Sequence, residues 1–314
     1  MNSKNLKLLT VIGTAWLLSM CSSPPASDPI KSGSTYEELV QFFNDWREFE
    51  SPEMIEGVPD YSVNAMKKQH ADLSIWKNRL NGFDTTGWPI KHQIDWYLIW
   101  AEMNGLDFEH RVKQPWFRDP AFYVWFYPYP TDVPEREGPN IYGAVELPKY
   151  KQPLSVSDAA EITARLNKAA AVFESAKVNL TGNGKDLWIL GTRSIREQSE
   201  ELSKFAESIK DTFPELAASA MEAKTASDQL AVWLDEKAPS KTATSGVGKE
   251  NYTWNLKNVH LLPYSWEDEV VLMERELMRA NSALVFEQHQ NRNLPKLEKA
   301  NNAQQFDKML EDAH

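Results

Sequence analysis

Cysteine, glycine and clustered basic residues are scarce in this sequence of 314 residues, and each scarcity excludes a class of protein. Cys21 is the only cysteine, so no disulfide can form within the chain. The formal net charge is −11, from 34 Lys and Arg against 45 Asp and Glu, and no basic cluster offsets it. A nucleic-acid-binding surface needs a basic patch, so that class of function is excluded.

Paired histidines are also missing. None of the six histidines is followed by Glu, and none has a second histidine three to five residues away. A helical zinc site of the common type needs two histidines one turn apart, so the sequence predicts no metal site of this kind. It also lacks the Gly-x-Ser-x-Gly motif of many serine hydrolases.

The shortage of glycine goes with a surplus of helix-forming and aromatic residues. Only 13 glycines are present, whereas Ala, Leu, Glu and Lys are frequent and there are 12 Trp. This composition favours helix, and the chain is long enough to bury a sizeable core. We therefore predict a mainly α protein, built as a helical bundle.

The first 21 residues have the pattern of an export signal. Lys4 and Lys7 precede an apolar run, residues 8–19, that is too short for an ordinary membrane-spanning helix. The next residues, Leu18-Ser19-Met20-Cys21, are similar to the lipobox of bacterial lipoproteins, in which the cysteine is acylated. Met20 departs from the small residue that usually precedes this cysteine.

Acylation also explains why an exported protein carries a lone thiol. The alternative is an ordinary secretory signal, although Pro24-Pro25-Ala26 fits the small-x-small cleavage pattern poorly. We predict that a lipid such as palmitate on Cys21 anchors the protein to a membrane. Ser22 follows the cysteine, and by similarity to lipoprotein sorting rules this favours the outer membrane, facing the periplasm.

After the leader, the sequence predicts a short tether and one helical domain. Residues 22–34 are rich in Ser and Pro and are typical of a flexible tether. The helical domain covers residues 35–314, with a sub-boundary near residue 154. Apolar spacing and capping residues predict helices over residues 35–49, 62–80, 89–103, 157–178, 185–213, 215–237 and 266–293, followed by an amphipathic tail, 297–310.

The helix that begins at Pro89 is the most aromatic part of the chain. Ile90, Ile94, Tyr97, Leu98 and Ala101 recur at helical spacing and are predicted to face the core. Asn104-Gly105 is the predicted stop.

Residues 127–153 cannot form a continuous helix, because six prolines interrupt them. A loop of this length is uncommon in a compact domain. We predict a loop that wraps over a helix pair, with room for one short strand at Ile141–Val145.

A few polar residues lie among apolar ones and need an explanation. Asp95, Arg118 and Asp119 are charged residues in aromatic surroundings, where each requires a partner. A pair between Arg118 and a carboxylate, fixing the turn before Pro120, is favoured over catalysis. His70 lies on the apolar stripe of its helix and is predicted to be a packed core histidine rather than a ligand.

Four segments, taken in order, resemble one bacterial family: DWYLIWAEMNGLDFEHRVKQPWFRDPAFY, AKVNLTG, SGVGKENYTWNLKNVHLLPYSWEDEV and ERELMRANSALVFEQHQNRNLP. From about Tyr36 to about Pro295, the chain resembles the N-terminal half of the domain-of-unknown-function 885 family. The members of this family are metallopeptidase-like, and some are lipoproteins.

This resemblance implies a zinc-dependent hydrolase in which the present chain forms one wall of the substrate cleft. The family's His-Glu zinc motif lies in its C-terminal half and is absent here. The chain is then a truncated or split reading frame, or a stand-alone derivative, and is inactive alone. No catalytic residue is expected in it, and zinc is expected only with a separate polypeptide that carries the C-terminal half.

Gly246, Gly248, Tyr252 and His260 are the candidates for substrate contact in this interpretation, because the glycines provide a flexible backbone beside a cleft. The alternative is a non-catalytic helical lipoprotein whose aromatic face binds a partner.

Overall fold

The computed structural model describes residues 34–130, 140–294 and 299–313. The predicted signal peptide, the lipidation site Cys21 and residues 22–33 of the tether lie outside the described residues. Within the described ranges the protein is a mainly helical bundle, as the sequence predicts. None of the helices in those ranges combines the length and the apolar character needed to span a bilayer.

Three helices form the N-terminal layer: α1 (Tyr36–Glu50), α2 (Val63–Asn81) and α3 (Ile90–Phe108). A capping box begins α1, because Thr35 and Glu38 each accept a hydrogen bond from the other's backbone N–H. A short hairpin, β1 (Met54–Ile55) and β2 (Val58–Pro59), joins α1 to α2. The layer has its own hydrophobic core, made by Leu39, Phe42, Trp46, Leu73, Leu80, Phe83, Ile99, Met103 and Leu106.

The buried face of α3 differs from the prediction. Ile90, Ile94, Tyr97 and Leu98 are all more than half exposed, at 77%, 51%, 54% and 51%, whereas Ala101 is buried as predicted. The core side is instead formed by Ile99, Met103 and Leu106. Because α3 is apolar around most of its circumference, periodicity alone could not select the buried side.

The predicted stop of α3 at Asn104-Gly105 is also wrong, because the helix continues to Phe108. The Asn104 side chain is buried and donates a hydrogen bond to the Asn258 carbonyl, 3.2 Å away. Gly105 packs beside Val259 of the same later segment. Both residues therefore serve helix packing here rather than helix termination.

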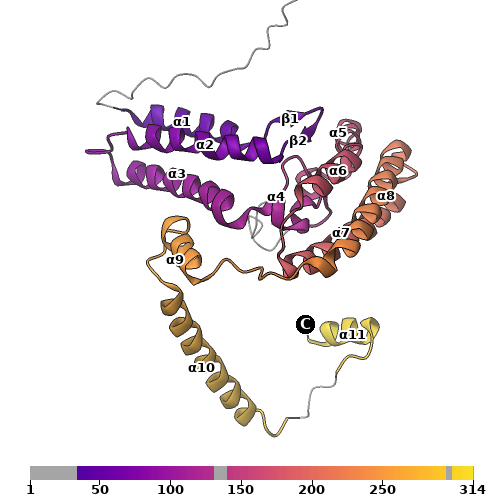
Figure 1. Ribbon diagram of the computed structural model, residues 1–314. Helices are drawn as coiled ribbons and strands as arrows, with labels where there is room; N and C mark the ends of the chain where they lie inside the picture. Colours follow the sequence, from indigo (N-terminus) through magenta and orange to yellow (C-terminus); the bar gives the residue numbers. More distant parts are fainter. Residues whose placement is uncertain (1–33, 131–139, 295–298, 314) are drawn as a thin grey trace, which may run out of the picture.

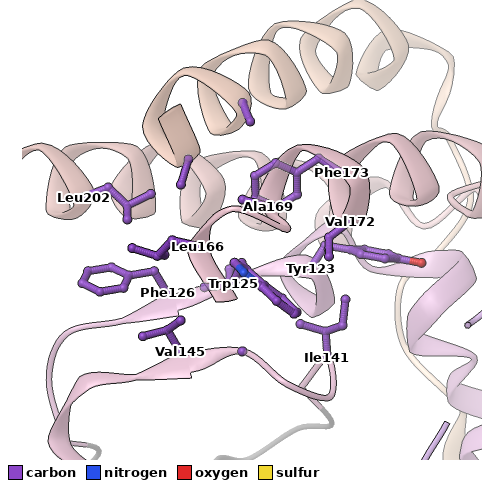
Figure 2. Packing of buried hydrophobic residues seen from close by; sticks show 14 of the residues in the cluster. Tyr123, Trp125, Phe126, Ile141, Val145, Leu166, Ala169, Val172, Phe173 and Leu202 are labelled. Carbon is purple, nitrogen blue, oxygen red and sulfur yellow. The ribbon is translucent and has the colours of Figure 1, made fainter. Parts of the chain in front are cut away.

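A second, larger core lies between the later helices and the segment that follows α3. Its helices are α5 (Val156–Leu166), α6 (Ala169–Asn179), α7 (Lys185–Ile209) and α8 (Pro214–Lys237). Figure 2 shows Trp125 and Phe126 packed near Leu166 and Leu202. The helix predicted over 157–178 is broken at Asn167-Lys168, and Ser155 rather than Ser157 caps its start.

The Pro-rich stretch contributes to this core. Strand β3 (Phe126–Tyr127) pairs in parallel with β4 (Val145–Glu146), so the strand predicted at 141–145 lies at the end of that range. Ile141 is nevertheless buried, and its N–H donates to the Phe122 carbonyl. Residues 131–139 of this stretch lie outside the described residues. Gln198 Oε1 accepts hydrogen bonds from the backbone N–H groups of Trp125 and Phe126, which fixes the stretch to α7.

The segment between α8 and the next helix is anchored rather than flexible. Ser245 Oγ accepts hydrogen bonds from the N–H groups of Asp186 and Leu187, at 2.9 and 3.2 Å, and so caps the start of α7. Lys241 Nζ donates to the Gly182 carbonyl at 2.7 Å.

The chain then forms α9 (Lys249–Asn258), α10 (Trp266–Gln290) and α11 (Ala303–Ala313). In Figure 1, α10 runs away from both cores.

Candidate functional site

Polar side chains gather where α2 meets the end of α3. His70 Nε2 lies 3.1 Å from Asp107 Oδ1, and the His70 ring stacks on His110 with centroids 5.0 Å apart. His110 Nε2 lies 3.0 Å from Gln69 Oε1, and Arg111 Nε donates to Asp107 Oδ2 at 2.8 Å. We call this group, together with Glu109, the polar junction: Gln69, His70, Asp107, Glu109, His110 and Arg111.

An irregular helical turn carries half of the polar junction. After α3 the chain widens into a π-helical turn, Glu109–Lys113, closed by a 2.7 Å hydrogen bond from the Gln114 N–H to the Glu109 carbonyl. Gln114 has a φ of 44°, in the left-handed region, and Pro115 follows it as the first residue of α4 (Pro115–Arg118). Such π turns are frequent at functional sites, so the polar junction is a candidate functional site.

The surroundings shift the acid–base properties of three of these groups. Loss of hydration raises the pKa of Glu109 to about 7, although the charge of Lys113 opposes the shift. Loss of hydration and the nearby His70 lower the pKa of His110 to about 4. Burial acts to raise the pKa of Asp107, but hydrogen bonds from Arg111 and His70 outweigh it and the pKa is lowered.

The polar junction can therefore hold or release a proton near neutral pH through Glu109, and it fastens α2 to α3. Within the described ranges, no group of three or more His, Cys, Asp or Glu residues could hold a metal ion. The zinc motif that the family resemblance implies lies in the family's C-terminal half and is absent from this sequence. His70, predicted to be a packed core residue, has a side chain that is 39% exposed and pairs with Asp107.

A groove of about 580 Å³ lies beside the junction and reaches it at Gln69. Its lining combines acidic side chains with the rings of Phe49 and Trp76. Its two basic side chains already have partners: Lys68 Nζ lies 2.6 Å from Asp72 Oδ2, and the Arg79 guanidinium lies over the Trp76 ring. The acidic lining residues are Asp45, Glu48, Glu53, Asp60 and Asp72. The groove is thus an acidic surface feature of the N-terminal layer.

The residues predicted to be structural charges all have partners. Asp95 Oδ2 accepts a 2.7 Å hydrogen bond from the Tyr36 hydroxyl, and Asp119 caps the short helix Pro120–Tyr123 by accepting from the Ala121 N–H. Burial raises the pKa of Asp119, although this capping bond and the charge of Arg118 oppose the shift.

The structure holds Arg118 in a different way from the predicted ion pair with a carboxylate. Arg118 donates to backbone carbonyls instead, those of Val112, Lys113 and Ser245. A carbonyl cluster offers the guanidinium its acceptors without a second buried charge.

The four predicted substrate-contact residues lie around α9. Gly248 precedes α9 with a φ of 85°, a conformation that favours glycine, and an added side chain at Gly246 would meet open space. Tyr252 packs edge-to-face on Trp266, with ring centroids 5.6 Å apart, and His260 is exposed. None of the four lines the acidic groove, and their role in binding stays a prediction.

Sequence reasoning missed the polar junction. The signal in the sequence was the run Asp107-Phe108-Glu109-His110-Arg111, in which four titratable residues lie at the end of an apolar helix and directly after it. Their partners on α2 are 37 to 41 residues away in sequence, so only the fold shows the pairing.

Helix α10 is the second notable surface. Its start is fixed, because Ser265 and Asp268 form a capping box and the Trp266 N–H donates to Thr253 Oγ1. None of the 25 residues of α10 is buried. Many of its large apolar side chains are more than half exposed: Val271, Met273, Leu277, Met278, Leu284, Val285 and Phe286. We call this surface the α10 face.

Comparison with known proteins shows a shared fold and no family. No family model matches this chain, and no curated protein matches it. Among solved structures, a candidate lipoprotein of unknown function from Shewanella oneidensis is similar, with a TM-score of 0.53 and 12% sequence identity. The match covers 88% of this chain and 52% of the other, so this chain spans about half the length of that protein.

Proposed function

We propose that this protein is a lipid-anchored protein of the bacterial cell envelope that works as one half of a larger helical assembly. In this proposal Cys21 carries the lipid, and the α10 face docks with a second polypeptide that supplies the other half. The assembly, rather than this chain alone, carries the function.

The α10 face is the observation that carries the proposal. Its seven large apolar side chains are each 55–67% exposed, and all lie on one helix. At 3.6 residues per turn, Met273, Leu277 and Leu284 share one side of that helix, and the other four lie on another side. Monomeric proteins rarely expose a contiguous apolar surface of more than a few hundred Å² (roughly 300–600 Å² for the largest patch), and larger ones usually mark interaction sites. Burial of one such side chain contributes about 1.5–3 kcal/mol, so covering the face would stabilise a complex substantially.

The structural neighbour supports the same interpretation. The match covers 88% of this chain and 52% of that protein, so the shared fold is one part of a longer chain there. That neighbour is itself described as a candidate lipoprotein, in keeping with the lipobox-like segment that ends at Cys21.

Metallopeptidase-like hydrolysis is the activity to test in the assembly, because of the four segments that resemble the domain-of-unknown-function 885 family. The described residues do not fit a zinc site, so in this proposal the metal ligands belong to the second polypeptide. The other candidate function is that of a non-catalytic lipoprotein that binds a partner, and the exposed α10 face is equally consistent with it.

Dye binding tests the exposed face. The purified mature chain should bind a fluorescent hydrophobic dye, and substituting Met273→Asp together with Leu277→Asp should remove most of the signal. Val232→Asp is the matched control, because Val232 is 59% exposed on α8, outside the α10 face. A monodisperse monomer that binds no dye would contradict the proposal.

Elemental analysis and a peptidase assay separate the two candidates. We expect no stoichiometric zinc and no peptide hydrolysis from the isolated chain, and both from a mixture with the family's C-terminal half. An assembly that forms but never hydrolyses peptides would favour the interaction lipoprotein.

A further inference from the structure

One side of α10, which includes Met273, Leu277 and Leu284 of the α10 face, has a regular pattern along the helix. Apolar or small residues recur at alternating steps of four and three residues, at Trp266, Val270, Met273, Leu277, Ala280 and Leu284. This is the seam spacing of helices that pair along their length, knob into hole. At a rise of 1.5 Å per residue the seam is about 27 Å long, which matches a partner helix of about five turns.

Acidic residues flank the seam on both sides. In the heptad numbering that this seam sets, Glu267 and Glu274 occupy the position on one side, and Glu269 and Glu276 occupy the position on the other. These two positions face the partner helix and select it by charge. Glu276 bonds to Arg279 within α10, but Glu267, Glu269 and Glu274 form no ion pair with any residue in the described ranges.

The whole helix is acidic as well. Six carboxylates, at positions 267, 268, 269, 274, 276 and 287, stand against two arginines, Arg275 and Arg279. Pairing of α10 with a second copy of itself would bring glutamates opposite glutamates in either orientation. Like charges in these positions are destabilising, so the flanks disfavour a homodimer through this face.

We infer that the partner of the α10 face is an amphipathic helix of about five turns whose apolar seam is flanked by Lys or Arg. This inference rests on the proposed function and adds the chemistry of the partner. The glutamates give the docking its selectivity, and the apolar seam gives it most of its buried surface.

Two synthetic peptides test the inference. Both carry Leu and Ile at the seam positions, and they differ only in Lys or Glu at the flanking positions. The purified mature chain should bind the Lys peptide at least about tenfold more tightly than the Glu peptide, because several ion pairs act together. High salt should remove most of this preference, since the flanks stay exposed.

Matched variants identify the residues responsible. Glu267→Lys with Glu274→Lys should remove the preference, because two flanking lysines then offset the two remaining flanking glutamates, whereas Leu277→Asp should weaken binding of both peptides. Val232→Asp on α8 should change neither.

Three outcomes would overturn the inference. Equal binding of the two peptides would refute the selection by charge, while an apolar docking face, and with it the proposed function, would stand. Binding of neither peptide would refute a helical partner. Self-association in sedimentation that Leu277→Asp abolishes would make a second copy the partner instead.

Discussion

At the scale of single residues, sequence patterns reveal contacts within one helical turn but not contacts between helices. Thr35 with Glu38 was predictable as a capping box, because both residues lie within one turn. The His70–Asp107 pair was not, because it depends on how α2 packs against α3. The pKa of Glu109 near neutrality and the lowered pKa of His110 likewise depend on the fold, because both shifts come mainly from burial.

Glu109→Gln should stabilise the protein at neutral and alkaline pH. The folded-state pKa is raised to about 7 from 4.5, so the unfolded chain ionises first and stability falls as pH rises through that window. Removing the carboxyl should raise the free energy of unfolding at pH 8 by up to about 3 kcal/mol, with little change below pH 4.5. Denaturant unfolding across pH measures this, and an equal effect of the substitution at pH 4 and pH 8 would refute it.

The Glu109→Gln variant should also reveal an opposite dependence of stability on pH, which comes from His110. His110 has its folded pKa lowered to about 4, so acidification from 6.5 to 4 costs stability as the unfolded chain takes up the proton. In the native protein the two groups oppose each other between pH 4.5 and 6.5. Once Glu109 is replaced, unfolding free energy should rise with pH across that window.

At the scale of secondary-structure elements, amphipathic helices were easier to read than uniformly apolar ones. Helices α7 and α8 lie close to their predicted ranges, and the apolar stripe of α7 at Ile195, Leu202 and Phe205 is buried. Helix α3 was misread, because its two tryptophans and its many other apolar residues extend around most of the helix. Tertiary packing, through Asn104 and Gly105, decided where it continued.

A pair of substitutions on α3 tests which side is buried. Met103→Ala should cost about 2–5 kcal/mol of unfolding free energy, because Met103 is fully buried in the N-terminal core. Ile94→Ser should change it by no more than about 0.5 kcal/mol, because Ile94 is half exposed. Thermal or denaturant unfolding compares the two. A larger loss from Ile94→Ser would restore the face that spacing predicts.

At the scale of the whole molecule, the sequence predicted the helical class and an amphipathic tail over residues 297–310. The structure agrees on the class and has seven exposed large apolar side chains on α10, before the tail. In our inference, the seam spacing of α10 marks where a partner helix packs, and its acidic flanks describe the chemistry of that partner.

Retention of the protein at the membrane should depend on the Cys21 sulfur. Cys21→Ser should abolish palmitate labelling and release the exported protein from the membrane fraction, since Cys21 supplies the only thiol for acylation. Ser22→Ala leaves the thiol in place and is the control for labelling. Labelling and membrane association that survive Cys21→Ser would remove the anchor from the account.

Amide hydrogen exchange of the isolated mature chain tests the central claim most directly, because α10 has no buried residue and little tertiary packing to hold it closed. We predict that the amides of α10 after its first turns exchange orders of magnitude faster than those of α7 and α8, and that adding the Lys-flanked peptide slows them selectively. If the amides of α10 in the isolated chain were as protected from exchange as those of α7, its apolar face would already be covered. The proposal that this face binds a partner would then be wrong.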